Sequence, residues 1–197
     1  MAFSPSLNRE FTDWDGRIRL RWKGIKVPPF IGKNEVEERA NAVWLLPRLD
    51  WFKLNFDGAS RGNLGPSGIG CVIRDHEGLF IGKVALPIPP DTNNIAEFKA
   101  IMIGLTECSR RSVKNIEIER DSSLVINAVR VRKTPNWRLQ AILDKVLQLL
   151  SGFQNFSCSH IYREANSELD LLSKSAAEGD SLSWWAHGFD IEQREQA

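Results

Sequence analysis

The order of apolar patterns between residues 51 and 179 restricts the possible folds more than any other feature of the sequence. Apolar and polar residues first alternate in three runs, at 51–57, 69–75 and 79–86, and a period of two is typical of strands in a sheet. The turn sequence Asp75-His76-Glu77-Gly78 separates the last two runs and indicates a hairpin. We therefore expect three antiparallel strands at the start of this segment.

The remainder of this segment alternates between helical and strand patterns. We expect, in order, a long helix at 95–111, a strand at 115–121, helices at 122–131 and 136–150, a strand at 153–162 and a helix at 163–179. Three hairpin-linked strands followed by strands that alternate with helices predict an α/β fold. Its five-stranded mixed sheet would carry packed helices.

The two ends of the chain lack a sustained period. We expect residues 1–50 to be a poorly structured N-terminal extension, apart from a short helix at 34–46, and residues 51–179 to be one domain. Residues 180–197 would be a C-terminal tail, in which Trp184 and Trp185 pack on the domain, with contact to a partner as the alternative.

Charge and hydropathy exclude several classes of protein. Lys and Arg number 26 against 25 Asp and Glu, so an anionic partner must meet a local patch. Such a patch, or simply a solvated face, is formed by Arg130, Arg132, Lys133 and Trp137. No apolar run reaches the roughly 18 to 20 residues of a membrane span, and no export signal is present. We expect an intracellular protein, nuclear or cytoplasmic, with no membrane partner.

The three cysteines, Cys71, Cys108 and Cys158, are odd in number and widely separated. This spacing suits neither a disulfide framework nor a zinc site, so we expect reduced, buried thiols.

Four acidic residues lie where predicted strands end or predicted helices begin. Asp57 and Asp121 end the first and fourth strands, whereas Glu97 and Asp170 lie in the first turns of two helices. Sites often form at such positions in sheets with helical connections. If the first and fourth strands are neighbours, both aspartates point into one crevice, and each helix adds a carboxylate from its rim.

Such a cluster is unfavourable without a cation, because two like charges about 4 Å apart repel by about 4 kcal/mol at an effective dielectric of about 20. Oxygen ligands favour Mg²⁺ or Mn²⁺ over zinc, and two such ions suit phosphodiester cleavage. Each acid also has a structural interpretation: a turn at Asp57, a capping box of Asn94 and Glu97, a helix cap at Asp121 and a solvated helix face at Asp170.

Four local motifs surround these acids: NFDGASRGNLGPSGIG, TNNIAEFKA, IERDSSLV and HIYREANSELDLLSKSA. In this order they resemble the type 1 ribonuclease H family, in particular the reverse transcriptase-like, ribonuclease H-like domains of plant retrotransposons. The resemblance covers about residues 51–179. It implies the ribonuclease H-like fold, a five-stranded mixed sheet with helices on both faces.

The resemblance also implies an endoribonuclease that hydrolyses the RNA strand of RNA:DNA hybrids, expected to act as a monomer. Asp57, Glu97, Asp121 and Asp170 would hold two Mg²⁺ ions, for which Mn²⁺ can substitute. His160 matches a histidine of a mobile loop that assists proton transfer or product release. A strand-end histidine without such a duty is the alternative.

Several polar and glycine residues match family positions that contact the hybrid or support the site: Gly58, Asn63, Gly65, Asn93, Asn94, Ser122 and Asn166. The glycine-rich backbone at 62–68 would approach the minor groove, where 2′-hydroxyl groups mark the RNA strand. The asparagines before the long helix suit helix capping equally well.

Three residues depart from the family pattern. Leu64 replaces a proline, Leu169 replaces an alanine, and Arg120 precedes Asp121 where smaller residues are frequent. Strand alternation is expected to turn Arg120 away from the Asp121 side. A domesticated, catalytically silent domain that binds nucleic acid or protein remains the alternative function. A glycosidase with a carboxylate pair explains two of the acids and not four.

Overall fold

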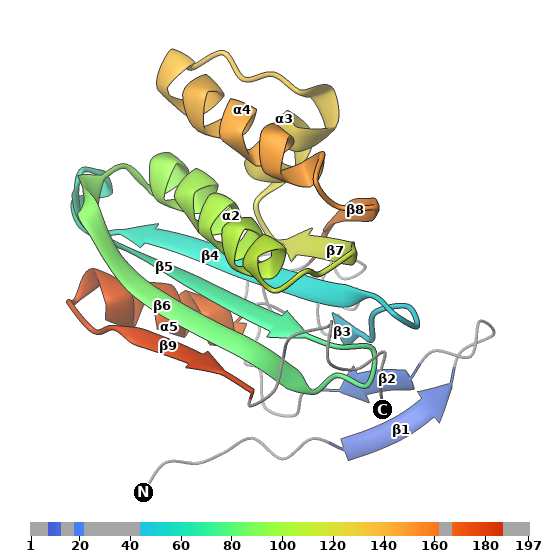
Figure 1. Cartoon of the computed structure of the whole chain (residues 1–197). Helices are drawn as coiled ribbons and strands as arrows, with labels where there is room; N and C mark the ends of the chain where they lie inside the picture. The colour runs from blue at the N-terminus through green and yellow to red at the C-terminus, as the bar shows by residue number, and fades with distance from the viewer. Residues whose placement is uncertain (1–7, 13–17, 22–43, 162–166, 187–197) are drawn as a thin grey trace, which may run out of the picture.

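The computed structural model describes residues 8–12, 18–21, 44–161 and 167–186 of the 197-residue chain. A six-stranded sheet with the order β8-β7-β4-β5-β6-β9 forms its centre (Figure 1). Strands β4 (Phe52–Ser60), β5 (Gly65–Arg74) and β6 (Phe80–Asp91) are antiparallel neighbours, as the three alternating runs predict. Strand β7 (Asn115–Arg120) lies parallel to β4 on one side and to β8 (Asn155–His160) on the other.

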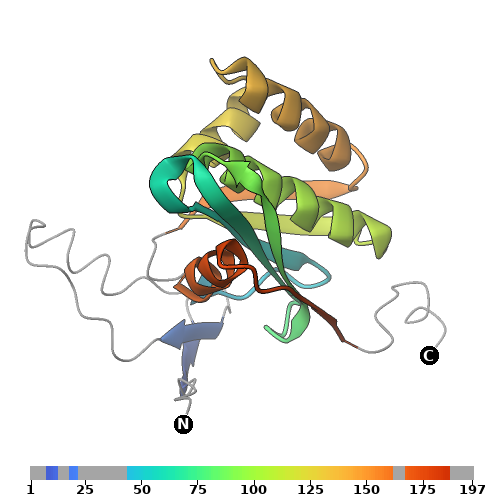
Figure 2. The same cartoon turned by 90° about the vertical axis from the view of Figure 1, so that its left-hand side faces the viewer.

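Helices cover both faces of this sheet. Helices α2 (Asn93–Arg110), α3 (Ser123–Val131) and α4 (Trp137–Leu150) lie on one face, and α5 (Ser167–Ala177) lies on the other (Figures 1 and 2). The short 3-10 turn η1 (Arg61–Asn63) joins β4 to β5. The mixed α/β architecture predicted from the sequence is therefore confirmed.

The sheet has one strand more than the sequence patterns predict. Strand β9 (Leu182–Trp185) pairs antiparallel with β6 from Gly82 to Ala85. A four-residue segment is too short to show a clear period, so this part of the predicted tail gave no strand signal. A second difference is that β4 does not end at Asp57 but continues to Ser60.

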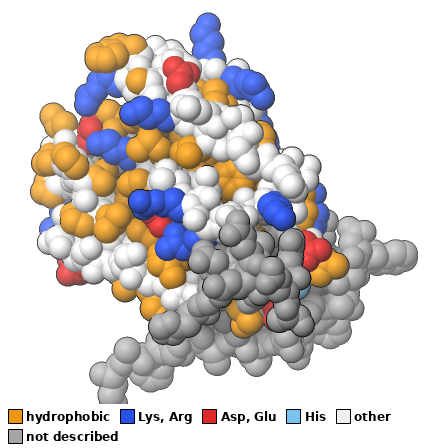
Figure 3. Space-filling view, in the orientation of Figure 1, with side chains coloured by type: hydrophobic (Ala, Val, Ile, Leu, Met, Phe, Trp, Pro, Cys, Tyr) orange, Lys and Arg blue, Asp and Glu red, His pale blue; other side chains and the backbone are white. Residues whose placement is uncertain are grey.

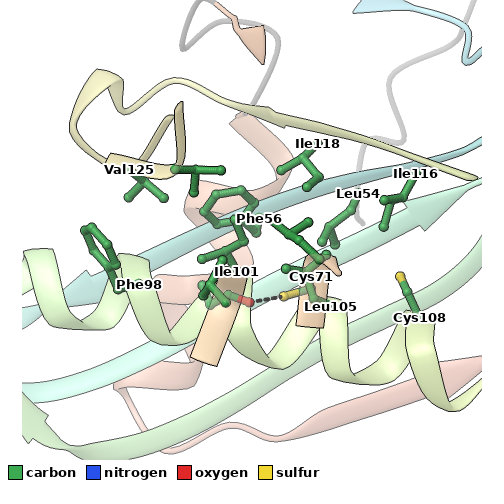
Figure 4. Packing of buried hydrophobic residues seen from close by; sticks show 14 of the residues in the cluster. Leu54, Phe56, Cys71, Phe98, Ile101, Leu105, Cys108, Ile116, Ile118 and Val125 are labelled. Carbon is green, nitrogen blue, oxygen red and sulfur yellow. Dashed lines mark hydrogen bonds between the residues drawn. The ribbon is translucent and has the colours of Figure 1, made fainter. Parts of the chain in front are cut away.

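The main core lies between the sheet and the helices α2, α3 and α4. Leu54 and Phe56 of β4 and Ile116 and Ile118 of β7 are completely buried there (Figure 4). The thiol of Cys71 donates a hydrogen bond to the backbone oxygen of Ala100, 3.3 Å away (Figure 4). Alternate residues of β4 and β7 thus face the side of the sheet that α2, α3 and α4 cover (Figure 1).

All three cysteines are free, and Cys71 and Cys108 are buried as predicted, whereas Cys158 is half-buried. Burial raises the pKa of Cys108 to about 12 and that of Cys158 to about 11. These thiols therefore stay protonated at neutral pH.

The described part of the N-terminal region forms a three-stranded antiparallel sheet from β1 (Asn8–Thr12), β2 (Ile18–Arg21) and β3 (Trp44–Leu45). Strand β3 contacts the central sheet, because Lys53 Nζ lies 2.6 Å from the backbone oxygen of Leu45 and the Trp44 indole donates to Asn55 Oδ1 at 3.3 Å. Most of the helix predicted at 34–46 lies outside the described residues, and its last described part is strand. The boundary at residue 50 stays a prediction.

No helix within the described ranges is long and apolar enough to cross a membrane.

Candidate active site

A cleft of about 650 Å³ lies at the end of the sheet where β4 and β7 separate, and all four predicted acids line it. Asp57 comes from β4, Glu97 from α2 and Asp170 from α5, whereas Asp121 directly follows β7. Asp57 is buried and the other three are half-buried. The structure thus brings together acids that are up to 113 positions apart in the sequence (170 − 57 = 113).

The strand register explains why the cleft opens here. The parallel ladder between β4 and β7 ends with the pair Asn55 and Glu119, and β7 itself ends at Arg120. Strand β4 continues beside β5 alone, so Asp57 lies next to the open end of the ladder. Crevices of this kind, at the carboxyl ends of parallel strands, are common binding sites in α/β proteins.

Glycine at position 58 allows helix α2 to approach β4 closely enough to add its acid. A Cβ atom at Gly58 would lie 2.2 Å from the carbonyl carbon of Ala96 and 2.3 Å from the backbone nitrogen of Glu97. No other residue fits without movement of the helix. Gly58 therefore fixes the position of Glu97 over the strand.

The guanidinium group of Arg120 lies among three of the four carboxylates. Its Nη1 atom pairs with Asp57 Oδ1 and lies 2.9 Å from Asp121 Oδ1, while Nη2 lies 3.0 Å from Glu97 Oε1. Nη1 also donates to the backbone oxygen of Phe56 at 3.1 Å, just beyond the last ladder pair. Burial disfavours the charge, but Asp57, Glu97 and Asp121 outweigh it and raise the pKa of Arg120 above its ordinary value.

The expectation that Arg120 turns away from the acids is wrong. Alternation places it on the same face of β7 as the buried Ile116 and Ile118, and α2 packs on this face. Glu97 projects from α2, so a side chain on this face of β7 can reach its carboxylate. Asp121 lies one residue beyond the strand, where alternation no longer determines the direction of a side chain.

Helix α5 adds two further polar contacts that the sequence analysis missed. Ser173 Oγ donates a hydrogen bond to Asp57 Oδ2, so both oxygens of Asp57 have a partner. Lys174 Nζ lies 2.6 Å from Asp170 Oδ2. Ser173 and Lys174 are three and four residues after Asp170, a spacing that places them on its side of the helix. This spacing was the signal available in the sequence.

The donor chemistry of the cleft fits a hard divalent cation. Its described lining includes the four predicted acids and no His or Cys, a set typical of Mg²⁺ sites. Glu97 Oε2 is buried without a hydrogen-bond partner among the described residues, so a cation would satisfy it. As placed, no group of three or more His, Cys, Asp or Glu residues in the described ranges is arranged to hold a metal ion. Arg120 provides the positive charge at this place.

Two of the predicted hybrid-contacting asparagines connect the loop after β4 to the start of α2. Asn93 Oδ1 accepts a hydrogen bond from the backbone nitrogen of Ser60 at 2.6 Å. Asn63 Oδ1 accepts one from the backbone nitrogen of Asn93 at 3.1 Å. Asn93 lines the cleft, whereas Asn63 is not among the residues that line it.

The helix caps differ from those the sequence suggests. Thr92 is the N-cap of α2, and its side chain accepts a hydrogen bond from the backbone nitrogen of Ile95 at 3.4 Å. The capping box of Asn94 and Glu97 is therefore wrong, and Asn94 is exposed in the first turn. Ser122, not Asp121, occupies the N-cap position of α3.

The remaining predicted residues lie at or outside the rim. Gly58 and Ser122 line the cleft, whereas Gly65 does not. Gly65 lies close to Arg61, whose backbone oxygen would be 2.1 Å from an added Cβ atom. His160 is the exposed last residue of β8 rather than part of a loop, and its Nε2 lies 3.1 Å from the backbone oxygen of Asp121. Asn166 lies outside the described residues.

Comparison with known proteins agrees with the fold and with the geometry of the cleft. The family model described as "Reverse transcriptase-like" matches residues 55–176, more than half of the chain. A protein of Arabidopsis thaliana that carries a ribonuclease H name is 32% identical over 148 residues, which are 75% of this chain and 23% of that protein. Ribonuclease HI of Halobacterium salinarum is 32% identical over 124 residues, 61% of each chain. The chain thus spans less than two thirds of the length of either relative.

Solved structures agree with these relatives. The crystal structure of ribonuclease H1 from Halobacterium salinarum has a TM-score of 0.63 and 30% identity, and the match covers 66% of this chain and 99% of that one. The LC11 ribonuclease H1, solved in complex with an RNA/DNA hybrid, has a TM-score of 0.61 and 28% identity, with 64% and 96% of the two chains covered. The chain therefore belongs to the reverse transcriptase-like family, within the type 1 ribonuclease H proteins.

Proposed function

We propose that this protein is a ribonuclease H that hydrolyses the RNA strand of RNA:DNA hybrids with the help of divalent metal ions. The observation that carries the proposal is the convergence of Asp57, Glu97, Asp121 and Asp170 in one cleft from four separate parts of the fold. The complex of the similar LC11 enzyme with an RNA/DNA hybrid supports the choice of substrate.

The four carboxylates are the groups that would hold the ions. Mg²⁺ held there would supply a lowered pKa of bound water and stabilisation of negative charge on the leaving oxygen of a phosphodiester. Asp57 is fixed for this task by the Ser173 hydroxyl, and Glu97 is fixed by the close contact between Gly58 and α2.

The rim of the cleft supplies groups suited to the sugar-phosphate backbone. Asn93 and Ser122 line it, and they offer an amide and a hydroxyl to phosphate or 2′-hydroxyl oxygens. We further propose that His160 exchanges protons near Asp121, since its ring lies beside the backbone of that residue.

One observation favours a second candidate function, a silent hybrid-binding domain. Arg120 already pairs with three of the four carboxylates, so part of their negative charge is offset without any ion. A domain of this kind would keep the surface that recognises the hybrid and lack cleavage.

The test is cleavage of an end-labelled RNA:DNA hybrid in the presence of Mg²⁺ or Mn²⁺, with double-stranded RNA and chelator as controls. We expect cleavage of the hybrid alone, with 3′-hydroxyl and 5′-phosphate ends. Asp57→Asn should lower the rate by about 100-fold or more, because a charged group that contacts the reaction centre is lost. Glu77→Gln, the same loss of a charge at an exposed position between β5 and β6, should cleave like the wild type.

Two results without cleavage would contradict the proposed nuclease. If the wild type binds the hybrid in a gel-shift assay but does not cleave it with either metal, the silent domain is the correct interpretation. If it neither binds nor cleaves the hybrid, both candidate functions are wrong.

A further inference from the structure

We propose that Arg120 is a built-in competitor of the metal ions: its guanidinium occupies the carboxylate site, offsets part of its negative charge and must leave it before a divalent cation binds. The inference rests on the proposed function for the identity of the cation. It concerns regulation of the same site by a residue of the chain itself.

The first argument is the balance of charge. The described lining of the cleft holds five acids, the four predicted ones and Glu178, against the three bases Arg61, Arg120 and Lys174, a net charge of 3 − 5 = −2. Arg61 pairs with Glu178, and Lys174 pairs with Asp170. The compensation of the other three acids therefore falls to Arg120. Its removal leaves three neighbouring carboxylates without this charge, the condition under which a divalent cation binds most strongly.

The second argument is the occupation of the ligand oxygens. The guanidinium contacts one oxygen each of Asp57, Glu97 and Asp121, and Ser173 takes the second oxygen of Asp57. An ion that Asp57 and Glu97 both bind would occupy the space where Arg120 lies. The Arg120 guanidinium and the metal ion therefore exclude each other.

The third argument is that Arg120 is held in this place. Its side chain is only 4% exposed, Phe56 provides a backbone acceptor at 3.1 Å, and the Phe56 ring lies 5.6 Å from the guanidinium carbon. The guanidinium has five donors in a planar fork, which suits several oxygen atoms at once. A lysine at this position keeps the charge but loses the fork.

Metal affinity separates this role from a structural one. A residue that only stabilised the carboxylates would weaken metal binding when removed, because the ligands would lose their arrangement. A competitor has the opposite effect, since its removal frees the ligands and strengthens metal binding.

The experiment measures Mn²⁺ binding to the full chain by electron paramagnetic resonance, from the loss of the signal of free Mn²⁺. We expect Arg120→Gln to bind Mn²⁺ about tenfold more tightly than the wild type, or better. Arg120→Lys should stay closer to the wild type. The matched control is Arg61→Gln, which removes a 65% exposed cation of the same cleft that pairs with Glu178 rather than with one of the four ligands, and it should change the affinity by less than about threefold. Equal or weaker binding by a folded Arg120→Gln variant would overturn the proposal.

A measurement on the wild type covers the case in which Arg120→Gln does not fold. The guanidinium nitrogen resonances of Arg120, assigned with the help of Arg120→Lys, are followed while Mg²⁺ is added. Competition requires that they shift with the same midpoint as the backbone amides of Glu97 and Asp121. Saturation of those amides with an unchanged Arg120 signal would refute displacement.

The outcomes also separate this inference from the proposed function. If Arg120→Gln binds Mn²⁺ more tightly and neither the variant nor the wild type cleaves the hybrid, the result supports the competitor and contradicts the nuclease. Cleavage by a wild type that binds Mn²⁺ as tightly as Arg120→Gln supports the nuclease and contradicts the competitor.

Discussion

Gly58 shows how one residue without a side chain positions a functional group in its neighbourhood. Strand β4 and helix α2 touch at this glycine, where a Cβ atom would lie 2.4 Å from the backbone oxygen of Ala96. The atoms it would meet belong to the backbone, which cannot move aside as a flexible side chain does. A larger residue would therefore shift the start of α2 and the carboxylate of Glu97 with it.

We expect Gly58→Ala to lower the free energy of unfolding by about 1–3 kcal/mol, the usual cost of overpacking. Any cleavage of the hybrid should fall more steeply, because Glu97 moves relative to Asp57. Urea unfolding followed by circular dichroism gives the stability, and the hybrid assay gives the rate.

The control is Gly152→Ala, where the added atom would meet the Leu149 carbonyl oxygen at 3.3 Å, distant from the cleft. A Gly58→Ala variant as stable and as active as Gly152→Ala would show that α2 tolerates the shift.

At the residue scale, the convergence of the four acids in one cleft agrees with the sequence patterns, whereas the position of Arg120 among them does not. Asp57 and Asp121 were identified because they follow alternating runs, a local signal that survives in the fold. The role of Arg120 depends on a contact with Asp57, a residue 63 positions away. Local alternation predicts only the face of the strand, and the reach of a long side chain beyond the end of a ladder has no local signature.

At the scale of elements, the predicted order of strands and helices is confirmed from β4 to α5, and β9 is the addition. The Trp185 ring explains why this strand forms. It lies over Gly82 of β6, where an added Cβ atom would be 2.2 Å from the indole, and the guanidinium carbon of Arg111 lies 3.3 Å from the ring centroid. Trp184 points to the opposite side and is 45% exposed. The prediction that both tryptophans pack on the domain is confirmed for Trp185, which packs against the core, but not for Trp184.

We expect Trp185→Ala to lower the free energy of unfolding by about 2 kcal/mol, somewhat less than the loss at a fully buried tryptophan. Trp184→Ala, one residue away on the exposed face, should lower it by less than about 1 kcal/mol. Thermal or urea unfolding of the two variants in parallel gives the comparison. Equal losses would show that the strand pairing of β9, and not the indole of Trp185, carries the stability.

At the scale of the whole molecule, a net charge of +1 produces no strong global attraction to nucleic acid. The distribution of charge matters more, and Figure 3 shows Lys and Arg side chains spread over one face with fewer Asp and Glu between them. Lys133 and the 79% exposed Trp137 line a second hollow of about 590 Å³, formed by the segment that joins α3 to α4 and by α4 itself. A cation beside an exposed aromatic ring suits the backbone of a nucleic acid strand.

We expect Lys133→Gln to weaken hybrid binding and to reduce the slope of log K against log salt concentration by about 0.9, the value of one phosphate contact. Lys114→Gln removes the same charge directly before β7, at the end of the strand away from the cleft, and should leave the slope unchanged. Fluorescence anisotropy at several salt concentrations measures both. Identical slopes for the two variants would place the hybrid elsewhere on the surface.

The pairing of β9 with only four residues of β6 has a consequence for self-association. From Leu86 to Asp91 the outer edge of β6 lacks this partner, yet Pro87, Pro89 and Pro90 lie in this half and carry no N–H group. A strand from a second molecule would find few donors to pair with there. The prolines and β9 thus each protect one part of the outer edge of β6. A molecule that lost β9 would expose only four residues of this edge to pairing with a strand of another molecule.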